Sequence, residues 1–181
     1  SGGILVRMIF KTFLEFNHDS NRNVIAIFLL GFLIITPMLP HYIWQATNYG
    51  KAAGNINDMQ VHLGHWLDEN TPPDSVFCTH DAGALRFFSG RTMIDFAGLV
   101  SPDIIHGNMT NREKLQYLYD NGCNYFIFFD ELFYWWSRFL PSNAYSKIYT
   151  VFLPDNVVCG RDTMSVFQIF WEQTDFPANS A

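Results

Sequence analysis

The apolar residues of this 181-residue chain are concentrated first in one uncharged stretch near the N-terminus. Val24–Leu39 carries no charge, and continuing to Trp44 brings the uncharged stretch to 21 residues. About 20 helical residues, at about 1.5 Å each, cross a hydrocarbon core of about 30 Å. Tyr42 and Trp44 lie where aromatic side chains occupy the membrane interface. The pattern predicts a transmembrane helix over residues 24–44.

Two alternatives stay open for this stretch. Its strictly apolar run is 16 residues, which is short enough for a buried core helix. A cleavable signal peptide is the other alternative, although the stretch starts late and no small-x-small site follows it closely. Pro37 and Pro40 are expected to kink or end the helix, because proline cannot donate a backbone hydrogen bond.

The charges on either side of the stretch predict its orientation. The cations that precede it are Arg7, Lys11 and Arg22, whereas the first cation after it is Lys51. By the positive-inside rule, residues 1–23 are cytoplasmic or interfacial and everything after about residue 45 is extracytoplasmic. The chain begins without methionine, and residues 4–16 have the apolar character of the end of a preceding segment. We therefore expect a fragment of a longer protein.

The pattern after the stretch changes to short helices and strands. Apolar residues at helical spacing from Ile56 to Leu67 predict a helix that ends before Pro72-Pro73. Thr110 and Glu113 have the spacing of a helix-capping box. The other predicted helix covers residues 82–89, and the predicted strands cover residues 75–79, 91–96, 125–129, 147–153 and 164–171.

These elements predict an α/β domain. Strands that alternate with helices form right-handed parallel crossovers, and the last two strands are expected to form an antiparallel pair. The expected architecture is a small two-layer or three-layer sandwich with a mostly parallel sheet of about five strands, preceded by one transmembrane helix. The predicted parts are a linker at 45–55, an extracytoplasmic domain at 56–175 and a tail at 176–181.

Composition excludes several classes of protein. The chain is 49% hydrophobic, 17% aromatic and only 15% charged, which is incompatible with intrinsic disorder. A net charge of −6 argues against binding to nucleic acid through phosphate neutralisation. Three cysteines do not form a disulfide scaffold, and a Cys123–Cys159 bridge stays an open alternative outside the cytoplasm.

Polar residues follow two neighbouring predicted strands. His80 and Asp81 come directly after the first strand, and Asp95 lies near the end of the second. Open α/β sheets usually place their ligand crevices at the carboxyl ends of parallel strands. We therefore name His80, Asp81 and Asp95 as members of the candidate polar or substrate-binding centre, to which the family resemblance described below adds Arg91. In the structural alternative, Asp81 is a helix N-cap and Asp95 is a turn residue or the ion-pair partner of Arg86 or Arg91.

Two metal-binding hypotheses have less support. Asp130-Glu131 follow the third strand, so acidic groups at three strand ends form a candidate cation or sugar site. A separate functional hypothesis is a small hydrolase or metal enzyme built on His80, Asp81 and Asp95. One face of the first predicted helix also carries residues of ligand type, although a solvated polar face is the favoured interpretation. These residues are Asp58, His62, His65 and Glu69. We predict no metal site and no cofactor.

Residues 126–140 form the densest aromatic run of the chain. The first part is expected to be sheet core. The second part, Phe133, Tyr134, Trp135 and Trp136, exceeds what a small core needs, so we predict that it contacts a membrane or a partner. Core packing is the alternative. Asn108-Met109-Thr110 is a glycosylation sequon, which has meaning in a eukaryotic secretory host.

Three segments together resemble a known family. They are residues 65–72 (HWLDENTP), 81–91 (DAGALRFFSGR) and 94–102 (IDFAGLVSP). They resemble the C-terminal extracytoplasmic region of polytopic glycosyltransferases of the GT-C type, relatives of the protein O-mannosyltransferases and of lipid A aminoarabinose transferase. The resemblance covers about residues 24–129, and residues 66–102 carry most of it.

The resemblance implies a function for the whole protein and a lesser role for this chain. Such enzymes transfer sugars from polyprenyl-phosphate donors and use acidic residues of an early extracytoplasmic loop, which this chain does not contain. No catalytic residue is carried over, and the positions that match are Asp81, Gly83, Arg91, Asp95 and Gly98. The implied partners are the lipid bilayer, the remainder of a polytopic membrane protein, and a lipid-linked sugar with its acceptor. A stand-alone membrane-tethered binding or assembly module is the alternative.

Overall fold

The computed structural model describes Arg7 and residues 20–176. The chain divides into two compact units, Ser1–Asn48 and Tyr49–Ala181. Most of the predicted N-terminal segment at 1–23, and the predicted tail beyond Phe176, lie outside the described residues.

The first unit is helical where it is described. It contains α2 (Ser20–Ile35), the 3-10 turn η1 (Thr36–Met38) and the first part of α3 (Leu39–Ile56), within which the boundary between the units falls. One helical stretch of the described chain, Val24–Asn70, is long and apolar enough to cross a membrane, and its most apolar part is not buried. The buried-helix alternative requires this part to lie in a core, and in the structure it does not.

The structure differs from the prediction at Pro40 and at the linker, but not at Pro37. Pro37 lies in η1, where the α-helix tightens to a 3-10 turn as expected for a residue that lacks a backbone donor. Pro40 lies in the first turn of α3 and does not interrupt it, because the first-turn amides of a helix have no partner within the helix. Residues 45–55, predicted as a linker, are helical and belong to α3.

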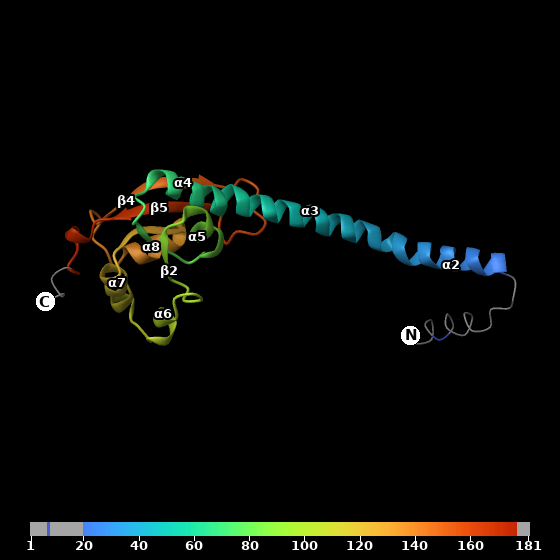
Figure 1. The fold of residues 1–181 in the computed structure, drawn as a ribbon, viewed down its shortest axis with the longest axis horizontal. Helices are drawn as coiled ribbons and strands as arrows, with labels where there is room; N and C mark the ends of the chain where they lie inside the picture. Colours follow the sequence, from blue (N-terminus) through green and yellow to red (C-terminus); the bar gives the residue numbers. More distant parts are fainter. Residues whose placement is uncertain (1–6, 8–19, 177–181) are drawn as a thin grey trace. The chain divides into compact units, whose positions relative to one another are not determined.

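The second unit is built on a five-stranded mixed sheet (Figure 1). Its strand order is β2-β1-β3-β5-β4. β1 pairs in parallel with β2 and with β3, whereas β5 is antiparallel to both β3 and β4. The predicted mostly parallel sheet is therefore not confirmed, although the strand number and the final antiparallel pair are. The strands are β1 (Val76–Thr79), β2 (Thr92–Asp95), β3 (Cys123–Phe129), β4 (Tyr145–Phe152) and β5 (Thr163–Ile169).

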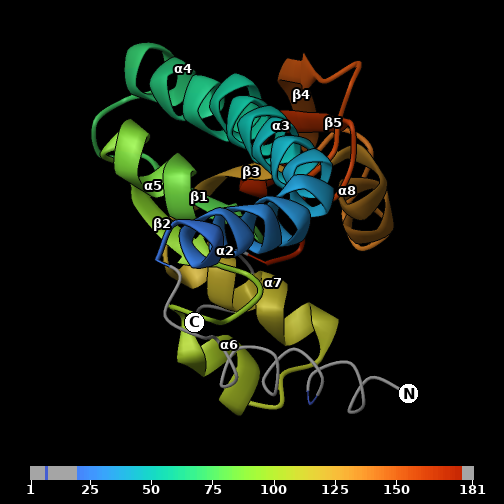
Figure 2. The same cartoon turned by 90° about the vertical axis from the view of Figure 1, so that its right-hand side faces the viewer.

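Helices cover both faces of the sheet, and Figure 2 shows α4 and α7 on opposite sides of β1 and β3. Alternate strand residues point to opposite faces, so Phe77 packs in one core and Cys78 in the other. The first core contains residues of α4 (His62–Asn70) and α5 (Gly83–Ser89). The second contains residues of α6 (Pro102–His106), α7 (Asn111–Asp120) and α8 (Asp130–Ser137).

Local sequence signals predicted some of the helices and missed others. The capping box of α7 is present, with the Thr110 side chain accepting from the Glu113 amide and the Glu113 carboxylate accepting from Thr110. α8 was not predicted, because its aromatic residues favour strands as much as helices. Between α3 and α4, the π-helical turn η2 (Asn57–Val61) buries both Met59 and Gln60.

Candidate functional site

Asp95 lies where the sequence predicted it, at the carboxyl edge shared by β1 and β2. Thr79 pairs with Asp95 in parallel register, so the residues after β1 lie at this same edge. The Asp95 side chain is 1% exposed, and its two oxygens accept from the amides of Ala97 (2.9 Å) and Val100 (2.9 Å). Its own amide donates to Ser101 Oγ (3.0 Å). We call residues 95–101 the Asp95 turn. Both oxygens of the Asp95 carboxylate are used in hydrogen bonds to the backbone of this turn.

Asp81 does not cap α5, which has Ala82 at its N-cap and no side-chain cap. Instead, Asp81 Oδ2 accepts a hydrogen bond of 2.7 Å from Gln60 Nε2. Gln60 is only 2% exposed, and sequence reasoning missed it. Its signal was present, because Gln60 falls between Ile56 and Leu63 at the helical spacing of the apolar face.

His80 packs between two aromatic rings at the same edge. Its ring lies 5.3 Å from Phe128 in a stacked arrangement and 4.7 Å from Phe129. Neither ring nitrogen has a hydrogen-bond partner among the described residues. Burial lowers the pKa of His80, whereas the charges of Asp81 and Asp95 act to raise it. The imidazole is therefore neutral near pH 7 and acts as an aromatic packing residue.

Arg91 lies at the opposite end of β2 from Asp95, because it precedes the strand whereas Asp95 ends it. Its side chain is 9% exposed and forms an ion pair of 2.9 Å with Asp68. The guanidinium also donates to the backbone oxygens of Asp68, Thr71 and Ser89. Arg91 thus ties the end of α4 to the start of β2. The predicted centre of His80, Asp81, Arg91 and Asp95 is separated into two places.

The other predicted ligand-type residues are also engaged separately. Among the described residues, no group of three or more His, Cys, Asp or Glu side chains is placed to hold a metal ion. His62 Nε2 lies 2.7 Å from the Tyr149 hydroxyl, and the His65 ring packs 5.0 Å from Phe88. The helix face of Asp58, His62, His65 and Glu69 therefore includes two contacts with other parts of the fold.

The three cysteines are free thiols. Cys123 is buried in the core that α7 and α8 cover, whereas Cys159 packs against the core on the other face of the sheet. The Cys123–Cys159 bridge is therefore absent, since the sheet separates the two side chains. Burial raises the pKa of the Cys159 thiol, and Asp81 raises it further, while a hydrogen bond with Gln60 acts in the opposite direction.

The aromatic run is divided by the periodicity of α8. Phe133 and Trp136 are 4% and 5% exposed and belong to the core, whereas Tyr134 and Trp135 are 69% and 40% exposed. Two of the four residues predicted to contact a membrane or partner are therefore core residues. The reason is geometric, because residues three apart lie on the same face of a helix.

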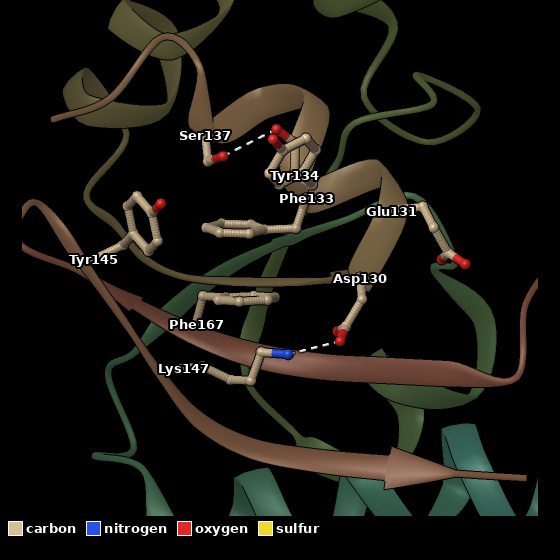
Figure 3. A pocket seen from close by; sticks show the side chains of 8 residues that line it. All are labelled: Asp130, Glu131, Phe133, Tyr134, Ser137, Tyr145, Lys147 and Phe167. Atoms are coloured by element: carbon tan, nitrogen blue, oxygen red, sulfur yellow. Dashed lines mark hydrogen bonds and ion pairs between the residues drawn. The ribbon is translucent and has the colours of Figure 1, made fainter. Parts of the chain in front are cut away.

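A concave surface lies between α8 and the strands β4 and β5 (Figure 3). We call it the α8 groove, and its volume is about 460 Å³. Phe133 and Phe167 stack with 3.4 Å between ring centroids, and the Tyr145 ring meets Phe133 edge-on at 5.0 Å. The lining residues are Asp130, Glu131, Phe133, Tyr134, Ser137, Tyr145, Lys147 and Phe167.

Charged side chains form one side of the α8 groove. Lys147 Nζ donates to Asp130 Oδ2 at 2.6 Å, and Figure 3 shows this pair beside the stacked rings. The other oxygen of Asp130 accepts from Ser165 Oγ at 2.5 Å. The groove therefore combines an apolar floor with a few fixed polar groups, which is the usual composition of a small-molecule binding surface. Sequence reasoning had placed Asp130 with the other strand-end acids and had not connected it with Lys147.

One comparison with known proteins matches the chain. Residues 54–167, more than half of the sequence, match the family described as Domain of unknown function (DUF8728). The chain belongs to this family. A search of curated proteins finds no match. The matched region begins just before η2 and ends within β5, so it contains the Asp95 turn and the α8 groove.

Proposed function

We propose that this chain is the C-terminal extracytoplasmic domain of a membrane glycosyltransferase that uses a polyprenyl-phosphate-linked sugar. The domain is non-catalytic by itself. It packs against the remainder of a polytopic membrane protein, and the α8 groove shapes the acceptor side of the active site. Its partners are the bilayer, that remainder, and the lipid-linked sugar with its acceptor; no role with nucleic acid is proposed.

The Asp95 turn is the observation that carries this proposal. It lies within IDFAGLVSP (residues 94–102), one of the three segments that carry the resemblance. Its acid binds two backbone amides, its serine accepts from a third, and Gly98 has a φ of 81°, a conformation that favours glycine. The side chains of Asp95 and Ser101 stabilise the backbone of this turn, which is a structural reason for the same residues to occur in related domains. This agrees with a domain that supports catalysis by residues elsewhere in the enzyme.

The α8 groove supports the acceptor-side role. An acceptor that carries hydroxyl groups on an apolar framework needs an apolar surface with a few polar contacts. Tyr134 is 69% exposed at the groove, and Lys147 and Asp130 keep 45% and 33% of their side chains exposed. These groups remain accessible to a ligand, unlike Asp95.

The gene sequence upstream of Ser1 gives the most direct test of the enzyme. Further hydrophobic spans, together with an early extracytoplasmic loop that carries acidic residues, would support the glycosyltransferase. An immediate start codon would overturn it and leave the alternative of a stand-alone membrane-tethered binding module.

The side of the membrane can be tested with the sequon. Asn108 is exposed in the turn between α6 and α7, so an oligosaccharyltransferase can reach it in a lumenal domain. We expect translation of the full chain with eukaryotic microsomes to give a product that a glycosidase shifts to lower mass. Asn108→Gln is the matched control and should lose the shift. A wild-type product without a glycan, in a membrane-inserted chain, would contradict the extracytoplasmic orientation.

A further inference from the structure

A pocket lined by two arginines lies among α7, the end of α8 and the last part of the described chain. Its volume is about 490 Å³, which is the size of a site for a small molecule. Arg112 comes from the first turn of α7, and Arg138 is the C-cap of α8. Asp175 and Phe176, which follow the 3-10 turn η3 (Trp171–Gln173), also line the pocket. We call it the arginine pocket.

The arginine pocket carries more cations than anions, although the whole chain has a net charge of −6. Its charged lining residues are Arg112, Arg138 and Asp175. In the α8 groove, by contrast, two acids accompany one lysine. A concave site with an excess of guanidinium groups attracts an anion, and arginine binds oxyanions through two parallel hydrogen bonds.

Arg138 has no ionic partner within the described part of the chain. No described carboxylate forms an ion pair with its guanidinium. Its Cζ lies 5.7 Å from the centroid of the Tyr134 ring, which is a cation–π contact. Stacking of this kind uses the face of the guanidinium plane and leaves the N–H groups at its edge for an oxyanion.

Arg112 shows that an oxyanion is accepted in the arginine pocket. Its Nη2 donates to Asp175 Oδ2 at 2.6 Å, and its Cζ lies 5.3 Å from the centroid of the Phe176 ring. The side chains of Arg112 and Asp175 are 60% and 67% exposed, so water solvates the pair and its net stabilisation is small. A ligand that offers more charge than one carboxylate can therefore compete with Asp175 for Arg112.

Apolar side chains form the rest of the arginine pocket. Leu115, Leu140 and Phe176 are buried, whereas Phe139 is 43% exposed. The Phe139 ring lies 5.5 Å from the ring of Trp135 and 5.9 Å from that of Trp136. These contacts hold Phe139 as an apolar wall beside the two arginines. An apolar group attached to a bound anion would leave water against this wall.

We propose that the arginine pocket binds a small organic phosphate, namely a phosphate monoester carried on an apolar group. A monoester offers three acceptor oxygens and nearly two negative charges, which suits guanidinium groups from two helices better than a single carboxylate does. Binding at this site does not depend on the proposed function, because all of its residues lie in the second unit and no transfer reaction is needed.

Titration of the full chain in micelles of an uncharged detergent tests the site. Phenyl phosphate is the probe, at about pH 7.5, where a phosphate monoester is almost fully dianionic. Inorganic phosphate tests the anion alone, and phenol tests the ring alone. Tryptophan fluorescence reports binding, since Trp135 and Trp136 contact Phe139. We expect phenyl phosphate to bind several-fold more tightly than inorganic phosphate and far more tightly than phenol. Absence of phenyl phosphate binding, or equal binding of phenol, would overturn the site.

Variants of Arg138 locate the binding. Arg138→Gln should weaken phenyl phosphate binding roughly five- to tenfold, because it removes a charged donor. Arg138→Lys should bind with intermediate affinity, since it keeps the charge and loses the planar fork. Arg86→Gln is the matched control, because Arg86 is an exposed arginine of α5 outside the pocket. It should bind as the wild type does. Wild-type affinity in Arg138→Gln would overturn the site.

Asp175→Asn tests the competition for Arg112 and should give a gain. It removes the carboxylate charge beside Arg112, so phenyl phosphate should bind several-fold more tightly. Asp120→Asn removes an exposed carboxylate at the other end of α7, where it accepts from Gln116, and should leave the affinity unchanged. A residue that only stabilised the fold would give no gain. Weaker binding in Asp175→Asn would contradict the competition.

The source of the phosphate is distinguished with vesicles. The pocket volume suits a small soluble molecule, so phosphatidic acid in phosphatidylcholine vesicles that hold the full chain should not displace phenyl phosphate. Phosphatidylserine at matched surface charge is the control for the surface potential. Displacement by phosphatidic acid and not by phosphatidylserine would overturn the soluble source and assign the arginine pocket to a lipid headgroup.

Discussion

The Asp95 turn and the α8 groove each contain an acidic residue at the carboxyl end of a parallel strand, yet the two acids act differently. Asp95 is 1% exposed and binds amides two and five residues further along the chain. Asp130 keeps a third of its side chain exposed and binds Lys147 and Ser165, which come from other strands. An acid that is satisfied by its own turn stabilises structure, whereas an acid held by distant strands remains at a surface that a ligand can reach.

The largest difference is expected between two adjacent residues of the α8 groove. Phe133→Ala removes a 4% exposed ring from the core and should lower the free energy of unfolding by about 4 kcal/mol. Tyr134→Ala removes a side chain that is 69% exposed and should cost about 0.5 kcal/mol or less. Urea unfolding of the full chain in micelles, followed by tryptophan fluorescence, measures both. Similar losses would show that the groove is part of a closed core.

Comparable changes at the two acids test the comparison itself. Asp95→Ala leaves the amides of Ala97 and Val100 without partners and should lower the free energy of unfolding by about 3 kcal/mol. Asp130→Ala removes a partly exposed ion pair and should cost about 1 kcal/mol. A loss at Asp130 as large as that at Asp95 would contradict the distinction.

Under the proposed function, Asp95 and Lys147, the ion-pair partner of Asp130, should separate folding from transfer in the full-length protein. Asp95→Asn should reduce the amount of folded enzyme more than the turnover of each molecule. Lys147→Ala should leave the amount of enzyme nearly unchanged and raise the KM for the acceptor. Normal expression with lost transfer in Asp95→Asn would assign Asp95 to the reaction instead.

Arg91 tests whether the predicted polar centre is truly divided. Arg91→Lys cannot reproduce the planar contacts with Asp68, Thr71 and Ser89, so we expect a loss of about 2 kcal/mol. Arg112→Lys is the control, because the side chains of Arg112 and its partner Asp175 are 60% and 67% exposed and the change should cost about 0.5 kcal/mol or less. Under the proposed function, the KM of the full-length protein for its acceptor should not change in Arg91→Lys. A raised KM would show that Arg91 contributes to acceptor binding.

The smallest expected effect is the pH dependence that His80 contributes beside the Asp95 turn. Its pKa is lowered in the folded state by burial, so the unfolded chain binds more protons as the pH falls below the ordinary histidine value of about 6.5. Stability should therefore decrease on acidification through this range. His80→Phe should flatten the dependence of the unfolding free energy on pH below about pH 6.5. Glu113 contributes only at lower pH, because its pKa is lowered from 4.5 by hydrogen bonds with Thr110. An unchanged slope in His80→Phe would contradict a neutral buried imidazole.

Much of the second unit was accessible to sequence reasoning where the interactions are local. The spacing of Thr110 and Glu113 predicted the capping box, and the apolar runs predicted all five strands within a few residues. The turn alternative for Asp95 was correct for the same reason, since its partners lie within five residues. The mostly parallel sheet was not confirmed, because β5 pairs with β3 and its direction depends on how the chain returns after α8.

The candidate site depended on contacts that no local pattern specifies. Gln60 meets Asp81 across 21 positions, Lys147 meets Asp130 across 17, and Asn55 meets Val157 across 102. The sequence by itself determined the apolar stretch, the short elements and the turns, because each follows from side chains a few residues apart. Only the tertiary structure decided that Phe133 is core, that Arg91 binds Asp68 and Thr71, and that Val157 lies beside α3. These outcomes depend on how the sheet and its helices pack, which joins residues that are distant in the chain.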